Sequence, residues 1–233
     1  MGRGIIVKTL AILPVKGNSE RVPRKNLRPV GKYSSGITEI KMEQLQKSQH
    51  ISEIFVSSES DEVLDLVSKF PGDKPVHLHK RDPQYAGDCP NDMWINYLSK
   101  EITNISADKV AMVSATAPFF TENDLDDLLE FYNKSKYDSV ATANVIKNFL
   151  WKDGKPLNYD PDAVGHWPLT QTLEPVYEIN SAVFVSRHRD FVQTGNRLPG
   201  KIGFYESSWM ASLDIDYPDD WKRFELLWQT YTK

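Results

Sequence analysis

The sequence has little cysteine, no long apolar run and no excess of positive charge, and each of these shortages excludes a class of protein. Cys89 is the single cysteine among 233 residues, so the chain can form neither an internal disulfide nor a cysteine-based metal cluster. No apolar stretch approaches the roughly 20 residues needed to span a bilayer. A net charge of −4 disfavours non-specific binding of nucleic acid, which usually requires a basic domain. We therefore expect no nucleic-acid or membrane partner and, most simply, a cytoplasmic location.

The composition is otherwise that of an ordinary globular domain, with 40% hydrophobic and 26% charged residues. Short apolar runs alternate with segments of helical spacing, and this alternation is typical of strand–helix units around a mostly parallel sheet. The apolar runs predict strands at residues 10–15, 54–57, 76–78, 110–113, 139–143 and 182–185. No linker, repeat or low-complexity tract divides the chain, so residues 1–233 are predicted to form one three-layer α/β domain.

Residues 146–179 interrupt this alternation. The interruption comes from glycines and prolines with two tryptophans among them, namely Gly154, Pro156, Pro161, Gly165, Pro168, Pro175, Trp151 and Trp167. A long segment of this kind within a compact domain is commonly functional. We expect an excursion from the sheet that acts as a lid or as a subunit contact.

Residues 16–28, directly after the first predicted strand, concentrate positive charge in an acidic chain. Five cations lie in these thirteen residues, opposed by Glu20 alone: Lys16, Arg21, Arg24, Lys25 and Arg28. In open α/β sheets, ligands bind outside the carboxyl ends of the strands, which is where this loop lies. Gly17 allows a close backbone approach, and its amide with those of Asn18 and Ser19 would line an anion site. A solvated basic loop is the ordinary alternative, but the position and the glycine favour a site for a triphosphate.

Asp214 and Asp216 alternate with apolar residues in the segment Leu213-Asp214-Ile215-Asp216. If this segment forms a strand, both carboxylates face the same side of it. Adjacent carboxylates repel each other, and Mg²⁺ relieves the repulsion because it binds one or two protein carboxylates together with phosphate oxygens and water. The alternative is a solvated acidic strand face, since an Asp-x-Asp pair alone is a weak signal.

Residues 12–27 read Ile-Leu-Pro-Val-Lys-Gly-Asn-Ser-Glu-Arg-Val-Pro-Arg-Lys-Asn-Leu. This stretch resembles the N-terminal signature of the acylneuraminate (CMP-sialic acid) cytidylyltransferases and their CMP-Kdo synthetase relatives. The resemblance continues through residues 55–62, 80–88, 114–119 and 213–221. It implies a Rossmann-like nucleotidyltransferase fold whose excursion serves dimerisation. It also implies transfer of CMP from CTP to a sugar acid with release of pyrophosphate, Mg²⁺ as cofactor, and CTP, a small anionic acceptor and a second copy of the chain as partners.

The same resemblance assigns roles to individual residues. Contacts with the CTP phosphates are expected from Lys16, Ser19, Arg21 and Lys25. Catalysis by neutralising charge is expected from Lys16, Arg21, Lys25 and Asp216. The other nucleotide contacts are expected from Gly17, Asn18, Asn26, Arg81 and Thr116, and of these the Arg81 guanidinium would read the cytosine edge. The implied metal ligands are Asp214 and Asp216, and the implied acceptor-binding residues are Gln171, Tyr177 and Asn180.

The residues expected to bind the acceptor depart from the family pattern at three positions. Thr170 and Phe120 stand where arginines are typical, and Ser181 replaces a glycine. An anionic sugar acid normally requires a bidentate arginine for its carboxylate, so the identity of the acceptor stays open, with the Arg-His-Arg segment 187–189 as one substitute source of charge. Three alternatives remain: the same transfer to a phosphonate or phosphate ester, an Asp-x-Asp glycosyltransferase, and a nucleotide-binding regulatory module.

Overall fold

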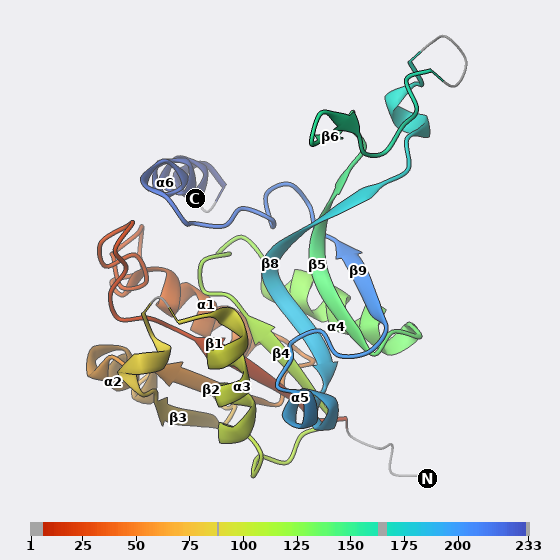
Figure 1. Cartoon of the computed structure of the whole chain (residues 1–233). Coiled ribbons are helices and arrows are strands. Elements are labelled where there is room, and N and C mark those ends of the chain that lie inside the picture. The colour runs from red at the N-terminus through yellow and green to blue at the C-terminus, as the bar shows by residue number, and fades with distance from the viewer. Residues whose placement is uncertain (1–6, 88, 163–166, 232–233) are drawn as a thin grey trace.

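The computed structural model describes residues 7–87, 89–162 and 167–231. Its main feature is a seven-stranded sheet in the order β3-β2-β1-β4-β8-β5-β9 (Figure 1). In chain order the strands are β1 (Thr9–Pro14), β2 (Glu53–Ser58), β3 (Val76–Lys80), β4 (Lys109–Val113), β5 (Ser139–Ile146), β8 (Val176–Arg187) and β9 (Ile202–Glu206). The helices are α1 (Gly36–Lys47), α2 (Asp61–Ser68), α3 (Asn91–Glu101), α4 (Glu122–Lys134), α5 (His188–Thr194) and α6 (Pro218–Tyr231). The predicted α/β architecture with a mostly parallel sheet is confirmed.

Helices cover both faces of the sheet because successive side chains of a strand point to opposite faces. On one face Ala11 and Leu13 of β1 pack with α1, α2 and α4. On the other face Leu10 and Ile12 pack with α3 and α5. Since β1 is buried on both faces, it is a continuous apolar run in the sequence. Helix α6 lies outside these layers and packs its aromatic face against α1.

Strand β8 runs against its neighbours. It pairs antiparallel with both β4 and β5, whereas β1, β2, β3 and β4 are parallel to one another, and β5 is parallel to β9. The carboxyl ends of the four parallel strands β1 to β4 therefore meet at one edge of the sheet. The loops that follow them are the segments that the sequence predicts to bind a ligand.

Beyond the sheet, β5 and the first part of β8 continue as a two-stranded ribbon, which we call the arm. The arm is paired from Ala143 with Ile179 out to Ile146 with Val176, and it projects away from the body in Figure 1. Past it lie the short strands β6 (Trp151–Lys152) and β7 (Lys155–Pro156) and the 3₁₀ turn η2 (Thr170–Thr172). The arm and its tip correspond to the predicted excursion 146–179, of which residues 163–166, including Gly165, lie outside the described residues.

Residues 213–216 do not form the strand considered for the Asp214–Asp216 pair. Ile215 bonds to the rest of the chain through its amide, which donates to the Thr116 carbonyl at 2.9 Å. The alternation of apolar and acidic residues arises because Ile215 is fully buried against α1 and α6 rather than in a sheet. In the ranges given above, no helix has the length and apolar character required to cross a membrane.

Candidate functional site

A cavity of about 760 Å³ opens at the carboxyl ends of β1, β2, β3 and β4. Eight of the nine predicted nucleotide-binding residues line it: Lys16, Asn18, Ser19, Arg21, Lys25, Asn26, Arg81 and Thr116. Asp216 lines the same cavity, although it lies almost 200 positions from the loop in the chain. The fold thus brings the predicted phosphate, base and metal residues to one place.

Three cations of the loop after β1 face this cavity, and each is held by the protein. Lys16 Nζ donates to the Gly87 carbonyl at 3.0 Å, which ties the loop to the segment after β3. Lys25, which is buried, donates to the Ile215 carbonyl and lies 3.3 Å from Asp216 Oδ1. Arg21 lies 3.2 Å from the same oxygen. All three cations are therefore paired with protein groups, and Lys25 is buried whereas Lys16 and Arg21 are exposed.

The other two loop cations point elsewhere. Arg24 pairs with Glu62 of α2 at 2.6 Å, and both side chains are more than half exposed. Arg28 pairs with Glu225 at 3.8 Å and stacks on the ring of Trp221 in α6. These two residues fasten the loop to neighbouring helices, and the other three loop cations face the cavity.

Gly17 differs from its predicted role in an anion site. Its amide donates to Glu59 Oε1 at 2.7 Å, and it does not line the cavity. A Cβ at this position would lie 2.3 Å from Cβ of Ser60, the residue whose hydroxyl caps α2. The glycine is needed because the loop passes directly against α2, and its amide is already engaged.

Arg81 is almost completely buried at the wall of the cavity, with 3% of its surface exposed. Its guanidinium donates to the Val15 carbonyl and to Glu59 Oε2, both at 3.0 Å. Its Nε is buried and has no hydrogen-bond partner among the described residues. Glu59, for which the sequence offers no functional signal, therefore holds both Arg81 and the loop amide of Gly17.

Two buried acceptor oxygens around the site also have no partner in the structure, Oδ1 of Asn26 and Oδ1 of Asp214. Asn26 uses its amide nitrogen to bind the Lys16 carbonyl at 2.7 Å. Burial raises the pKa of Asp214. Buried polar atoms are normally satisfied, so these oxygens and Arg81 Nε form a set of groups suited to a bound ligand.

Asp214 and Asp216 could supply two of the ligands of a divalent cation. Asp216 reaches the cavity, and Asp214 beside it has the unsatisfied oxygen. No group of three or more His, Cys, Asp or Glu suited to a metal occurs in the described part of the chain. Two carboxylates completed by phosphate oxygens and water are a donor set that Mg²⁺ accepts, so the residues present fit this ion.

The predicted acceptor residues lie on the arm, beside it or at its tip, and none of the three lines the cavity. Gln171 belongs to η2, and Tyr177 stacks on Phe204 with ring centroids 4.7 Å apart. Asn180 donates to Asn144 Oδ1 across the ribbon at 3.1 Å. Ser181, next in the chain, does line the cavity and has a φ of 61°, a left-handed conformation that favours glycine.

The Arg-His-Arg segment also lies away from the cavity. Arg187 pairs with Asp138 and Asp190, and Arg189 pairs with Asp190 at 3.2 Å. The wall on the β8 side is instead formed by Trp94, Phe184 and Arg197. Arg197 lies in an irregular segment with no pattern around it, so the sequence offers no signal for its position.

Lys41 supports the cavity from beneath. It is fully buried in α1 and donates to the carbonyls of Ala117 and Phe120 at 3.0 and 2.8 Å. Burial lowers the pKa of Lys41 to about 7. The turn that it holds directly follows the cavity residues Ser114, Ala115 and Thr116.

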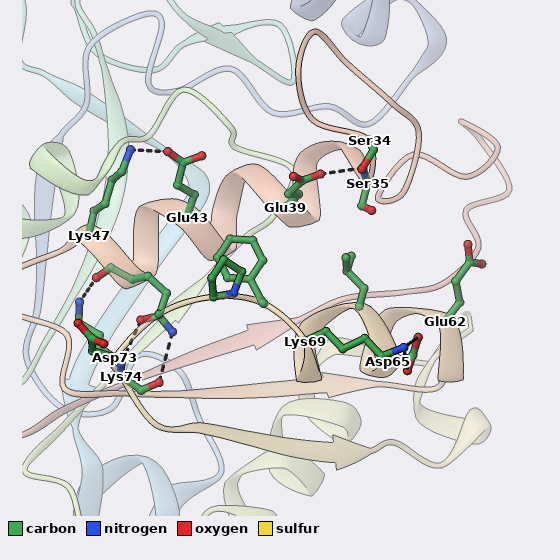
Figure 2. A pocket seen from close by; sticks show the side chains of 15 residues that line it. Ser34, Ser35, Glu39, Glu43, Lys47, Glu62, Asp65, Lys69, Asp73 and Lys74 are labelled. Carbon is green, nitrogen blue, oxygen red and sulfur yellow. Dashed lines mark hydrogen bonds and ion pairs between the residues drawn. The ribbon is translucent and has the colours of Figure 1, made fainter.

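A second cavity, of about 830 Å³, lies between α1 and α2 (Figure 2). Its charged groups pair with each other along the groove, as Lys47 does with Glu43 and Lys69 with Asp65. Glu39 accepts from the amide of Ser35 at 2.8 Å. None of the predicted site residues lines it, so the cavity at the strand ends is the candidate site.

Comparison with known proteins gives a consistent result. The profile of a family described as cytidylyltransferase matches residues 10–149. The chain is 24% identical to an N-acylneuraminate cytidylyltransferase A from Danio rerio over 222 residues, covering 91% of this chain and 48% of that protein. It is 22% identical to a CMP-N,N'-diacetyllegionaminic acid synthase from Legionella pneumophila, covering 95% of this chain and 96% of that protein.

The fold matches as well. A solved CMP:2-keto-3-deoxy-manno-octonic acid synthetase complexed with CTP superposes with a TM-score of 0.65 at 12% identity, covering 96% of this chain and 99% of that one. The chain spans about half the length of the Danio rerio relative, at 48%, and of the Streptococcus agalactiae relatives named N-acylneuraminate cytidylyltransferase, at 52%.

Proposed function

The chain belongs to the cytidylyltransferase family, and from this premise we propose that it transfers CMP from CTP to an anionic sugar acid with release of pyrophosphate. The observation that supports the proposal most is the convergence of Lys16, Arg21 and Lys25 with Arg81 and Asp216 on one cavity. Relatives named for sialic and legionaminic acids support the choice of acceptor class. Family membership also favours nucleotidyl transfer over the Asp-x-Asp glycosyltransferase alternative.

In the proposed reaction, an acceptor hydroxyl oxygen forms a bond to the α-phosphorus of CTP. The bond from that phosphorus to the oxygen bridging to the β-phosphate breaks, its electron pair leaves with pyrophosphate, and the hydroxyl proton passes to solvent. Phosphoryl-type transfer depends mostly on positioning and on neutralising charge. In this reaction Lys16, Arg21 and Lys25 would stabilise the departing pyrophosphate, and Arg81 would bind the base. Their position around the cavity and the unpartnered Nε of Arg81 support these roles.

Asp214 and Asp216 would hold the Mg²⁺ of the proposed reaction, which would neutralise charge on the phosphate oxygens when bound. Oδ1 of Asp216 is held by two cations: Lys25 Nζ lies 3.3 Å from it and Arg21 Nη2 lies 3.2 Å from it. Asp214 contributes the buried oxygen without a partner. Burial raises the pKa of Asp214 because it disfavours the charged carboxylate, and a bound cation would offset this cost.

The test is pyrophosphate release from CTP and Mg²⁺ with a panel of acceptors that includes N-acetylneuraminate, Kdo, phosphonates and phosphate esters. Asp216→Asn should reduce release by at least about a hundredfold, because it removes a carboxylate that faces the cavity. Asp219→Asn is the matched control, since Asp219 is exposed and pairs with Lys222. Absence of CTP binding would overturn the proposal.

The remaining outcomes separate the alternatives. If pyrophosphate is released with a phosphonate or phosphate ester but with no sugar acid, the acceptor is the smaller anion. CTP binding without release on the whole panel would favour the regulatory module.

We further propose that two copies of the chain associate through the arm, so that one copy's Gln171, Tyr177 and Asn180 complete the acceptor site of the other. The support is that the arm and the segment at its tip carry large exposed apolar side chains, with Ile179 of the arm at 41% and Trp151 of the tip at 55% exposure. Patches of this kind on soluble proteins mark interaction surfaces. Light scattering should give a dimer at micromolar concentration for the wild type and a monomer for Ile179→Asp. Leu226→Asp, on the exposed side of α6, should leave the dimer intact, and a monomeric wild type would contradict the proposal.

A further inference from the structure

The β8 side of the cavity contains one cation that the nucleotide assignment leaves unused. Arg197 lines the cavity and lies over the ring of Phe184, with its guanidinium carbon 4.5 Å from the ring centroid. Phe184 sits on β8 opposite Met112 of β4, and β4 is the neighbour of β1. Arg197 therefore lies over β8, which is two strands away from β1 in the sheet.

Arg197 differs from the other cavity cations because its partner in the described part of the chain is the ring of Phe184 rather than an oxygen atom. Lys16, Arg21, Lys25 and Arg81 each have a carboxylate or a main-chain carbonyl within hydrogen-bond distance. Within residues 7–87, 89–162 and 167–231, Arg197 has neither a hydrogen bond nor an ion pair. It is nevertheless partly buried, and this burial lowers its pKa. A guanidinium taken out of water without a hydrogen-bond partner is costly, so its place in a cavity indicates an anionic ligand.

The surroundings of Arg197 suit a compact anion attached to an organic body. The guanidinium fork matches the paired oxygens of a carboxylate or phosphonate. The Phe184 ring fixes the plane of the fork from one side. Trp94, whose indole nitrogen donates to Asn91 at 2.9 Å, lines the same cavity and offers an apolar wall to the rest of the ligand.

We propose that Arg197 binds the anionic group of the acceptor and so determines which acceptors the enzyme accepts. This inference rests on the proposed function, in which the triphosphate occupies the cations of the loop after β1 and the second substrate takes the β8 side. The shared chemistry is a pair of anionic oxygens, carried by a carboxylate in a sugar acid or by phosphorus in a phosphonate.

The test measures binding directly, so that it does not depend on turnover. The protein is saturated with a CTP analogue that has a methylene group between the α- and β-phosphorus. It is then titrated calorimetrically with N-acetylneuraminate, with the methyl ester of N-acetylneuraminate and with 2-hydroxyethylphosphonate. Arg197→Gln, Arg197→Lys and Arg189→Gln are compared with the wild type. Arg189 is a matched control because it is exposed, pairs with Asp190 and does not line the cavity.

Arg197→Gln should weaken the preferred anionic probe about 10- to 100-fold, the range for a charge-assisted hydrogen bond. Arg197→Lys should recover part of this loss, whereas Arg189→Gln should change nothing. CTP affinity should stay within about twofold in all variants, which also shows that they fold. The preferred probe decides between a carboxylate and a phosphonate, and the ester should bind wild type and Arg197→Gln equally weakly.

Two results would overturn the assignment. One is that the wild type binds CTP but no anionic probe, or that wild type and Arg197→Gln bind the preferred probe with the same affinity. The other is an Arg197→Gln variant that loses affinity for CTP instead of the probe, which would give the arginine to the nucleotide. A wild type that fails to bind CTP would overturn the proposed function itself.

Discussion

At the β1 end of the cavity the protein itself anchors the four cations Lys16, Arg21, Lys25 and Arg81, whereas at the β8 end Arg197 rests on the ring of Phe184. Anchored side chains lose little conformational freedom when a ligand arrives, so they bind a highly charged ligand at low entropic cost. The β8 end is left to be completed by the acceptor and, in the proposed dimer, by the arm of a second chain. We infer from this contrast that the β1 end suits one fixed ligand, whereas the β8 end suits a ligand that varies.

Removing an anchor at the β1 end should change both the stability of the protein and its affinity for CTP. Glu59→Gln deprives the buried Arg81 of its charged partner and weakens the contact with the Gly17 amide. We expect a loss of about 2 kcal/mol in the free energy of unfolding and about a tenfold weaker affinity for CTP. Denaturant unfolding and calorimetric titration with CTP measure the two quantities.

Glu62→Gln is the matched control for this substitution. Glu62 also pairs with an arginine, but the pair is exposed, so we expect a change below about 0.5 kcal/mol and unaltered CTP affinity. Equal effects of the two substitutions would contradict the idea that the anchors organise the nucleotide end.

The stability of the protein should depend on pH through Lys41, which holds the turn at Ala117 and Phe120. Its pKa is about 7 in the folded protein against 10.5 for an ordinary lysine, so the unfolded chain binds the extra proton between these values. The free energy of unfolding should therefore rise with pH from about 7 towards 10, by at most about 1.4 kcal/mol per pH unit from this group. Below pH 7 the contribution is constant.

Lys41→Met removes the titrating group while keeping its length. The difference in unfolding free energy between wild type and Lys41→Met, measured at intervals from pH 6 to 10, should increase with pH over that window. Parallel curves would show that Lys41 keeps an ordinary pKa and that the turn is held in another way.

At the β8 end the smallest effect is expected from Ser181→Gly. A left-handed conformation costs a serine about 1–2 kcal/mol, and part of the relief is offset by the greater freedom of glycine in the unfolded chain. We expect a net stabilisation of about 0.5 kcal/mol, seen as an unfolding midpoint about 1–2 °C higher. Ser186→Gly, on the same strand but in its regular part, should instead lower the midpoint. A decrease in both variants would show that the backbone at Ser181 is not strained.

Much of the fold could be predicted because its signals are local. The run at residues 10–15 becomes β1 (Thr9–Pro14) since a strand buried on both faces must be apolar throughout. The direction of β8 could not be predicted in the same way, because an apolar run looks alike in parallel and antiparallel strands. The strand considered at 213–216 is absent for a related reason: burial of Ile215 by helices imitates the alternation of a half-buried strand.

Likewise, the part of the candidate site that is contiguous in the sequence could be predicted. The basic loop is contiguous in the chain, so its pattern of charges and glycine is visible in the amino-acid sequence alone. Glu59 acts through contacts 22 and 42 positions away, and Arg197 reaches the cavity from an irregular segment, so neither has a sequence pattern. The contribution of Arg81, Asp214 and Asp216 to binding stays a prediction until the experiments above are done.

The place of β8 between β4 and β5 has a consequence for biosynthesis. Strand β5 leaves the ribosome about 40 residues ahead of the end of β8, yet it joins the rest of the sheet only through β8. At roughly 5–20 residues per second, the nascent chain spends about 2–8 s with the free edge of β4 and an unattached β5. Unpaired strand edges recruit other chains, so this interval is when the protein is most exposed to misassembly and when a chaperone would matter most.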